Sequence, residues 1–144
     1  MDIPKINTNR FAQNVVSDEL KKREFSVIQS GRNFMVNQKI INVRGCNYDN
    51  DWARNFRTKK GAVLGGWDKL NPEKFDYLIC VSFSEAFNNV LYFIFTQKDV
   101  LLLFPITTLG GRERGLKNLT LFENDEESHR IIKDSENRWC KIKR

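Results

Sequence analysis

Apolar residues recur at helical spacing near the start of the chain. In residues 8–25 they are Phe11, Val15, Val16 and Leu20. A capping candidate, Thr8 or Asn9, precedes them, and a run of basic residues follows. The pattern predicts an amphipathic helix, with Gln13 directed toward its buried face.

Three short β-type runs follow this helix. They read FSVIQS, NFMVN and KIINVRG, and they cover residues 25–30, 33–37 and 39–45. Polar or glycine-containing turns separate them, and NQK makes a tight connection between the last two. The runs predict an antiparallel meander.

The second half of the chain has a different pattern. Residues 77–83 and 90–95 are continuously apolar, which indicates strands covered on both faces and therefore helices on either side of a sheet. A short helix is expected over 96–105, between a threonine cap and a proline. A last helix is expected within 122–136, because its start is acidic and its later part is basic.

These elements predict one α+β domain over residues 1–144, with a central mixed β-sheet flanked by helices. The length suits a single core and is too short for two ordinary domains. Between the meander and the apolar strands, residues 46–74 have weak periodicity. We expect a long loop or flap there, with a short turn of helix near residues 67–70.

Composition limits the expected cellular location of the protein and the kinds of metal or catalytic site that it can hold. No apolar run is long enough to span a membrane and the N-terminus has no signal-peptide core, so we expect a cytoplasmic protein without a membrane partner. Three cysteines without a CxxC pair favour reduced thiols. A single histidine argues against a histidine-rich zinc site or a serine protease triad.

Four polar residues carry a family resemblance. Gln13 lies in the first helix, Asn33 on the second run, and Asn42 and Arg44 in NVRG on the third. The helix, the meander and these places resemble the PD-(D/E)xK nuclease superfamily, which includes restriction endonucleases and Holliday-junction resolvases. The resemblance covers roughly residues 9–105 and implies a restriction-endonuclease-like core.

The resemblance also implies a metal site, which the residues of this chain do not supply. In the superfamily, acids at the places of Gln13, Asn33 and Asn42 surround a divalent cation, and a lysine at the place of Arg44 assists the attacking water. Mg²⁺ prefers carboxylate oxygens, and amides lack the negative charge. Arg44 cannot deprotonate to act as a base. We therefore expect degenerate catalytic positions with no metal or other cofactor.

Two alternatives remain open for these positions. Asp49 and Asp51 follow the third run and are candidates to replace the missing acids, which would give an active Mg²⁺-dependent DNA endonuclease. Alternatively, Asn33 and Asn42 are ordinary turn and strand-end residues, since Asn is favoured in turns. Gln13 would then be a helix amide bonded to backbone.

Residues 46–74 are also a candidate nucleic-acid surface. Basic and aromatic side chains alternate there, which suits phosphate contact combined with base stacking. The candidates are Tyr48, Trp52, Arg54, Arg57, Lys59, Lys60, Trp67 and Lys69, with Arg112 and Arg114 further along. Alternatively, the aromatic residues attach a flap to the sheet and the basic residues are solvated.

The formal net charge of +6 favours a polyanionic partner. Our first hypothesis is a DNA-binding or accessory protein on a catalytically impaired nuclease-like fold. The second is the active endonuclease. The third is a protein-interaction or inhibitor module that keeps only the scaffold, with a protein partner or a homodimer.

Overall fold

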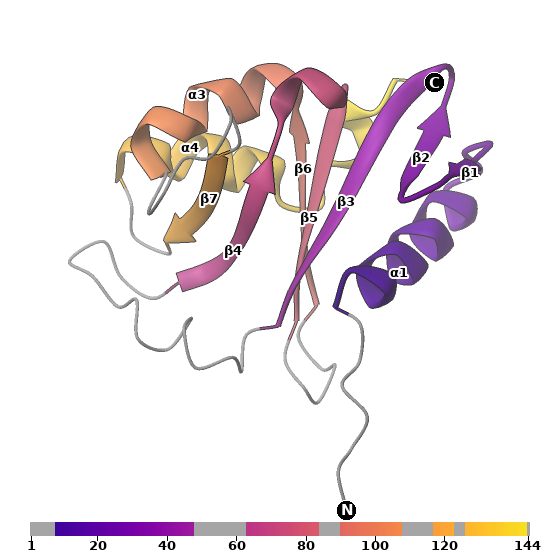
Figure 1. Cartoon of the computed structure of the whole chain (residues 1–144), viewed down its shortest axis with the longest axis horizontal. Coiled ribbons are helices and arrows are strands. Elements are labelled where there is room, and N and C mark those ends of the chain that lie inside the picture. Colours follow the sequence, from indigo (N-terminus) through magenta and orange to yellow (C-terminus); the bar gives the residue numbers. More distant parts are fainter. Residues whose placement is uncertain (1–7, 48–62, 84–89, 108–116, 123–125, 144) are drawn as a thin grey trace, which may run out of the picture.

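The computed structural model describes residues 8–47, 63–83, 90–107, 117–122 and 126–143 (Figure 1). The helices are α1 (Thr8–Lys22), α3 (Gln97–Thr107) and α4 (Glu126–Ser135), with short 3-10 helices η1 (Pro72–Lys74) and η2 (Trp139–Lys141). The strands are β1 (Ile28–Ser30), β2 (Asn33–Val36), β3 (Lys39–Asn47), β4 (Val63–Leu70), β5 (Tyr77–Phe83), β6 (Leu91–Thr96) and β7 (Lys117–Phe122). Among the described helices, none has the length and apolar character required to cross a membrane.

The main sheet has five strands in the order β1-β2-β3-β5-β6. Its neighbours are antiparallel except for the parallel pair β3 and β5. A parallel connection usually runs through a helix. Here β4 and η1 lie in the crossover, and β4 pairs with β7 in a separate two-stranded sheet (Figure 1). The predicted α+β fold with a mixed sheet is confirmed.

Two hydrophobic clusters lie on opposite faces of the main sheet. On one face, Ala12, Val16 and Leu20 of α1 pack against alternate residues of β2, β3 and β5. On the other face, α3, α4 and the β4–β7 pair contribute the cover, and alternate β5 residues such as Leu78 and Cys80 point toward it. Every residue of β5 is therefore buried, as its continuous apolar pattern predicted.

The β2–β3 hairpin turns tightly at two residues. Asn37 and Gln38 have φ values of +51° and +65°, and the pairing on either side runs from Val36 opposite Lys39 to Asn33 opposite Asn42. Two consecutive left-handed residues suit the right-handed twist of a hairpin. The predicted tight connection is confirmed, and its lysine belongs to β3.

The expected flap over residues 46–74 is wrong at both ends. β3 continues to Asn47, and β4 with η1 occupies 63–74, so the expected helical turn near residues 67–70 is strand. Register shifts between Val63 and Gly65 and between Trp67 and Leu70 interrupt the alternation that marks a strand. Residues 48–62 lie outside the described residues.

The later elements also differ in extent. β7 was not predicted, although the run KNLTLF buries Leu119 and Leu121 at alternate positions. α4 begins at Glu126, so the helix predicted within 122–136 starts later. α3 continues through Pro105 to Thr107, so the helix does not end at the proline; the fixed φ of proline is itself helical, and the cost is one lost donor and crowding of the preceding turn. The threonine cap is confirmed: Asp99 N donates to Thr96 Oγ1 at 3.1 Å, and Thr96 N donates to Asp99 Oδ2 at 3.0 Å.

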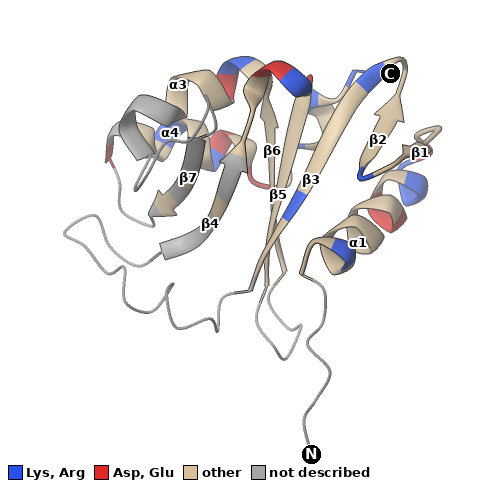
Figure 2. Cartoon of the chain, viewed as in Figure 1, with Lys and Arg blue, Asp and Glu red and all other residues tan. Residues whose placement is uncertain are grey.

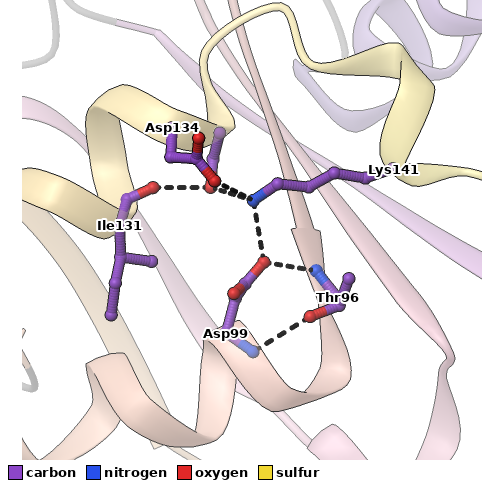
Figure 3. Close-up of polar contacts among 6 residues, drawn as sticks. Thr96, Asp99, Ile131, Asp134 and Lys141 are labelled. Carbon is purple, nitrogen blue, oxygen red and sulfur yellow. Dashed lines mark hydrogen bonds and ion pairs between the residues drawn. The ribbon is translucent and has the colours of Figure 1, made fainter.

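A lysine joins the C-terminal segment to this cap. Lys141 Nζ donates to Asp99 Oδ2 at 2.9 Å and to Ser135 Oγ at 2.7 Å (Figure 3). Asp134 lies 3.8 Å from the same ammonium group. The side chains of Lys141 and Asp99 are 16% and 20% exposed, so this ion pair is largely shielded from solvent. It ties the start of α3 to the end of α4.

Candidate functional site

Asn33 and Asn42 form a side-chain pair across the hairpin. They are direct partners in the β2–β3 register, and Asn42 Nδ2 donates to Asn33 Oδ1 at 2.8 Å. Both residues are half-buried. The structure therefore brings together the two places where the resemblance expects metal-binding acids. The groups that meet there are neutral and bind each other.

Strand alternation assigns this pair to one face of the sheet. Phe34, Ile41 and Val43 belong to the cluster beneath α1. Their neighbours Asn33 and Asn42 therefore point to the opposite face, because successive side chains of a strand alternate.

Gln13 does not join the amide pair. It lies on α1, and its Nε2 donates to the backbone oxygen of Arg32 at 3.1 Å. The side chain is half-buried at the edge of the helix face, so the expectation that it points into the buried face holds only in part. Its contact matches the alternative interpretation of a helix amide bonded to backbone.

Arg44 lies on the same face as the amide pair, two residues further along β3. In the parallel register its partner is Cys80, whose thiol is buried. Burial raises the pKa of the Cys80 thiol well above its ordinary value, while the Arg44 guanidinium acts in the opposite direction. A guanidinium at this position repels a divalent cation.

The described part of the chain has no cluster of acidic side chains that could hold a metal in place of the amide pair. The described residues contain no group of three or more His, Cys, Asp or Glu side chains placed to bind one ion. Several predicted site residues lie outside the described ranges: Tyr48, Asp49, Asp51, Trp52, Arg54, Arg57, Lys59, Lys60, Arg112 and Arg114. Lys69 lies in β4, where only its backbone is described.

The stacking role predicted for Trp67 does not fit its position. Its side chain is 4% exposed and packs in the cluster with Cys46, Leu70 and Leu119. The indole N–H is buried without a hydrogen-bond partner among the described residues. Because the ring is covered by the protein, no face of it is presented to a nucleic-acid base.

Two basic residues that the sequence did not single out as candidate binding residues lie near the turn end of the hairpin. Asn37 Nδ2 donates to the backbone oxygen of Lys143 at 3.1 Å, so the turn contacts the C-terminal segment. Lys39 and Lys143, both exposed, therefore lie on adjacent segments. No local motif links residues so far apart in the sequence, and only the tertiary contact reveals the association.

No family model, curated protein or solved structure matches this chain.

Proposed function

We propose that this chain is a DNA-binding or accessory protein with a restriction-endonuclease-like core whose metal site is catalytically silent. The observation that carries the proposal is the Asn33–Asn42 pair, with its amides 2.8 Å apart. The resemblance expects two carboxylates at these places. The spacing of such a site is retained while its negative charge is lost.

The residues around the pair support the proposal that this site does not cleave DNA. A hard divalent cation needs carboxylate oxygens, whereas an amide oxygen is a weak and neutral ligand. The Arg44 guanidinium adds positive charge on the same face. Without a bound cation, nothing at the amide pair polarises a phosphodiester or lowers the pKa of an attacking water.

Contact with DNA does not require that metal. Lysine and arginine side chains bind backbone phosphates and release counterions, a term that depends on charge and not on sequence. The net charge of +6 supplies this attraction. The chain therefore has the electrostatic requirement for binding without the chemical requirement for cleavage.

Filter binding of duplex DNA at several salt concentrations tests the binding half. We expect affinity to fall linearly with the logarithm of salt concentration. Affinity that is independent of salt, or no binding at low salt, would contradict the proposal. Co-purification of a protein partner without nucleic acid would favour the interaction-module hypothesis instead.

Incubation of plasmid DNA with the chain in Mg²⁺ or Mn²⁺ tests the silent half. We expect intact plasmid. Cleavage by the native chain that disappears in Asp49→Ala and Asp51→Ala variants would replace this proposal with the active endonuclease.

A further inference from the structure

Four exposed lysines lie on four separate segments at one end of the main sheet. They are Lys39 at the start of β3, Lys74 in η1, Lys98 in the first turn of α3, and Lys143 near the C-terminus. We call this surface the lysine end. In Figure 2, blue ribbon marks the start of β3, η1 and the start of α3 along the top of the view.

Backbone contacts connect the segments that carry these lysines. Ile40 N donates to Asp76 Oδ2 at 2.8 Å, and Asp76 N donates to Ile40 O at 2.9 Å. Gln97 N donates to Asp76 O at 3.0 Å, and Gln97 Nε2 donates to Pro72 O at 2.7 Å. The segments bearing Lys39, Lys74 and Lys98 are therefore joined through one aspartate and one glutamine.

The C-terminal segment is attached to the same end. Lys143 N donates to the Tyr77 hydroxyl oxygen at 3.3 Å, and Lys143 O accepts from Asn37 Nδ2 at 3.1 Å. Both contacts use the backbone of Lys143. Its ammonium group is not needed for either contact.

The nearby carboxylates are mostly engaged within the protein. Asp76 accepts from a backbone N–H, and Asp99 binds Lys141 and its own helix cap. Glu73 is the exposed acid among these segments. Asp76 is half-buried and keeps its charge, because its hydrogen-bond donor is a neutral backbone N–H. The four exposed lysines still outnumber Glu73 and Asp76, which leaves an excess of positive charge at the surface.

Other described surfaces are closer to balance. From α4 to Arg138, the basic and acidic side chains described as exposed are equal in number: Arg130, Lys133 and Arg138 against Glu126, Asp134 and Glu136. On α1 and the β1–β2 connection, Arg10, Lys21, Lys22 and Arg32 stand with Asp18 and Glu24. Among described side chains, the lysine end has the largest excess of exposed positive charge.

We infer that the lysine end is the surface that contacts the DNA phosphate backbone, an inference that rests on the proposed function. Lysine ammonium groups on flexible stems act as point charges toward phosphates. A hydrogen-bonded scaffold holds their attachment points together and lowers the ordering cost of binding. The contact is indifferent to base sequence, because no base edge is read by a lysine–phosphate pair.

Two variants with equal net charge test this inference. The first carries Lys39→Gln, Lys74→Gln, Lys98→Gln and Lys143→Gln. The matched control carries Lys21→Gln, Lys22→Gln, Arg130→Gln and Lys133→Gln, all exposed residues of α1 and α4, outside the four segments that form the lysine end. Each variant lowers the formal net charge from +6 to +2, so a difference between them reports position and not total charge.

Anisotropy of a labelled duplex of arbitrary sequence is measured for the native chain and both variants across a salt series. We expect the first variant to bind about tenfold or more weakly than the control, with its log–log salt slope reduced by about 1 for each lysine that contacts a phosphate. Circular dichroism and thermal melting establish that both variants are folded. If the fourfold variant does not fold, the four single Lys→Gln variants are compared with the four single control variants.

The outcomes separate this inference from the proposed function. If the native chain binds and both variants lose affinity equally, or the control loses more, DNA binding stands and the lysine end is rejected as its site. If the native chain does not bind duplex DNA at low salt, the proposed function fails and the inference fails with it. Selective loss in the first variant supports both.

Discussion

The two ends of the β2–β3 hairpin differ in how their polar groups are used. At the open end, Asn33 and Asn42 face each other and bond at 2.8 Å. At the turn end, Lys39 is exposed, and the turn residue Asn37 binds the backbone of the C-terminal segment. The amides are thus paired within the protein, whereas the lysine charges face solvent.

The two ends of one hairpin therefore differ in kind: one has paired residues at a fixed spacing, and the other has exposed charge. At the open end, two neutral amides stand at the places where the proposed resemblance expects carboxylates, and neutral amides attract a metal ion only weakly. The turn end has no motif in the sequence, yet the fold gathers positive charge there from four segments. For binding a polyanion, the accessible charge at the turn end matters more than the spacing of the amide pair.

The largest expected effect is gained by restoring carboxylates at the open end. The variant Asn33→Asp, Asn42→Glu, Arg44→Lys should acquire divalent-metal binding, because two adjacent carboxylates repel each other until a cation neutralises them. Mg²⁺ at about 100 times its dissociation constant should raise the free energy of unfolding by about 2.7 kcal/mol. Thermal melts with and without Mg²⁺ measure this, and plasmid cleavage is assayed in parallel.

Adding Gln13→Glu to that variant sharpens the test. Gln13 lies on α1, which covers the other face of the sheet, and its side chain binds the backbone of Arg32. We therefore expect the fourth change to add little to the metal response. The native chain is the control and should not respond. A restored variant that melts identically with and without Mg²⁺ would contradict the pairing of Asn33 with Asn42.

The elements that the sequence predicted correctly are those with a local pattern of apolar residues. The helix, the meander and the apolar strands follow from periodicity, because α1 buries one face and β5 is covered on both. The meeting of Asn33 and Asn42 also follows, since a tight two-residue turn sets the register. These features depend on residues that are close together in sequence.

The features missed depend on distant partners. β4 is interrupted by register shifts, so no regular alternation identified it. β7 does alternate at Leu119 and Leu121, but the run is short and its partner strand is distant in sequence. The burial of Trp67 follows from that pairing and not from its basic surroundings in sequence. The lysine end likewise needs contacts between residues near 40, 76, 97 and 143, which have no common motif.

The next effect tests the scaffold that supports the lysine end. Lys141→Met removes the partner of a largely shielded Asp99 carboxylate, so we expect a loss of about 2 kcal/mol in the free energy of unfolding. Lys143→Met is the control and should change stability by less than about 0.5 kcal/mol, since the hydrogen bonds from Lys143 to Asn37 and Tyr77 use its backbone atoms. Urea denaturation of both variants measures the difference. Equal losses would show that the Lys141 network does not support this end.

A smaller effect measures the amide pair itself. Asn33→Ala, Asn42→Ala and the double variant form a double-mutant cycle. We expect a coupling energy of about 1 kcal/mol from the single hydrogen bond. Urea denaturation supplies the four free energies of unfolding. A coupling energy near zero would mean that the two amides meet without stabilising the open end.

The smallest effect concerns the turn. Gln38→Gly should raise the free energy of unfolding by about 0.5 kcal/mol, because Gln38 has a φ of +65° that glycine adopts without steric cost. The control Gln29→Gly, in β1, should lower it, since glycine weakens a strand. Thermal melting ranks the two variants. A destabilised Gln38→Gly variant would contradict the left-handed conformation at the turn end.

The most direct measurement combines binding and chemistry in one sample. Labelled duplex DNA is titrated with the native chain across a salt series in Mg²⁺, anisotropy is recorded, and the same samples are then run on a denaturing gel. We expect affinity that falls linearly with the logarithm of salt concentration and DNA that remains intact throughout. Binding insensitive to salt, or cleaved DNA, would contradict an account in which this protein holds DNA by charge and leaves it uncut.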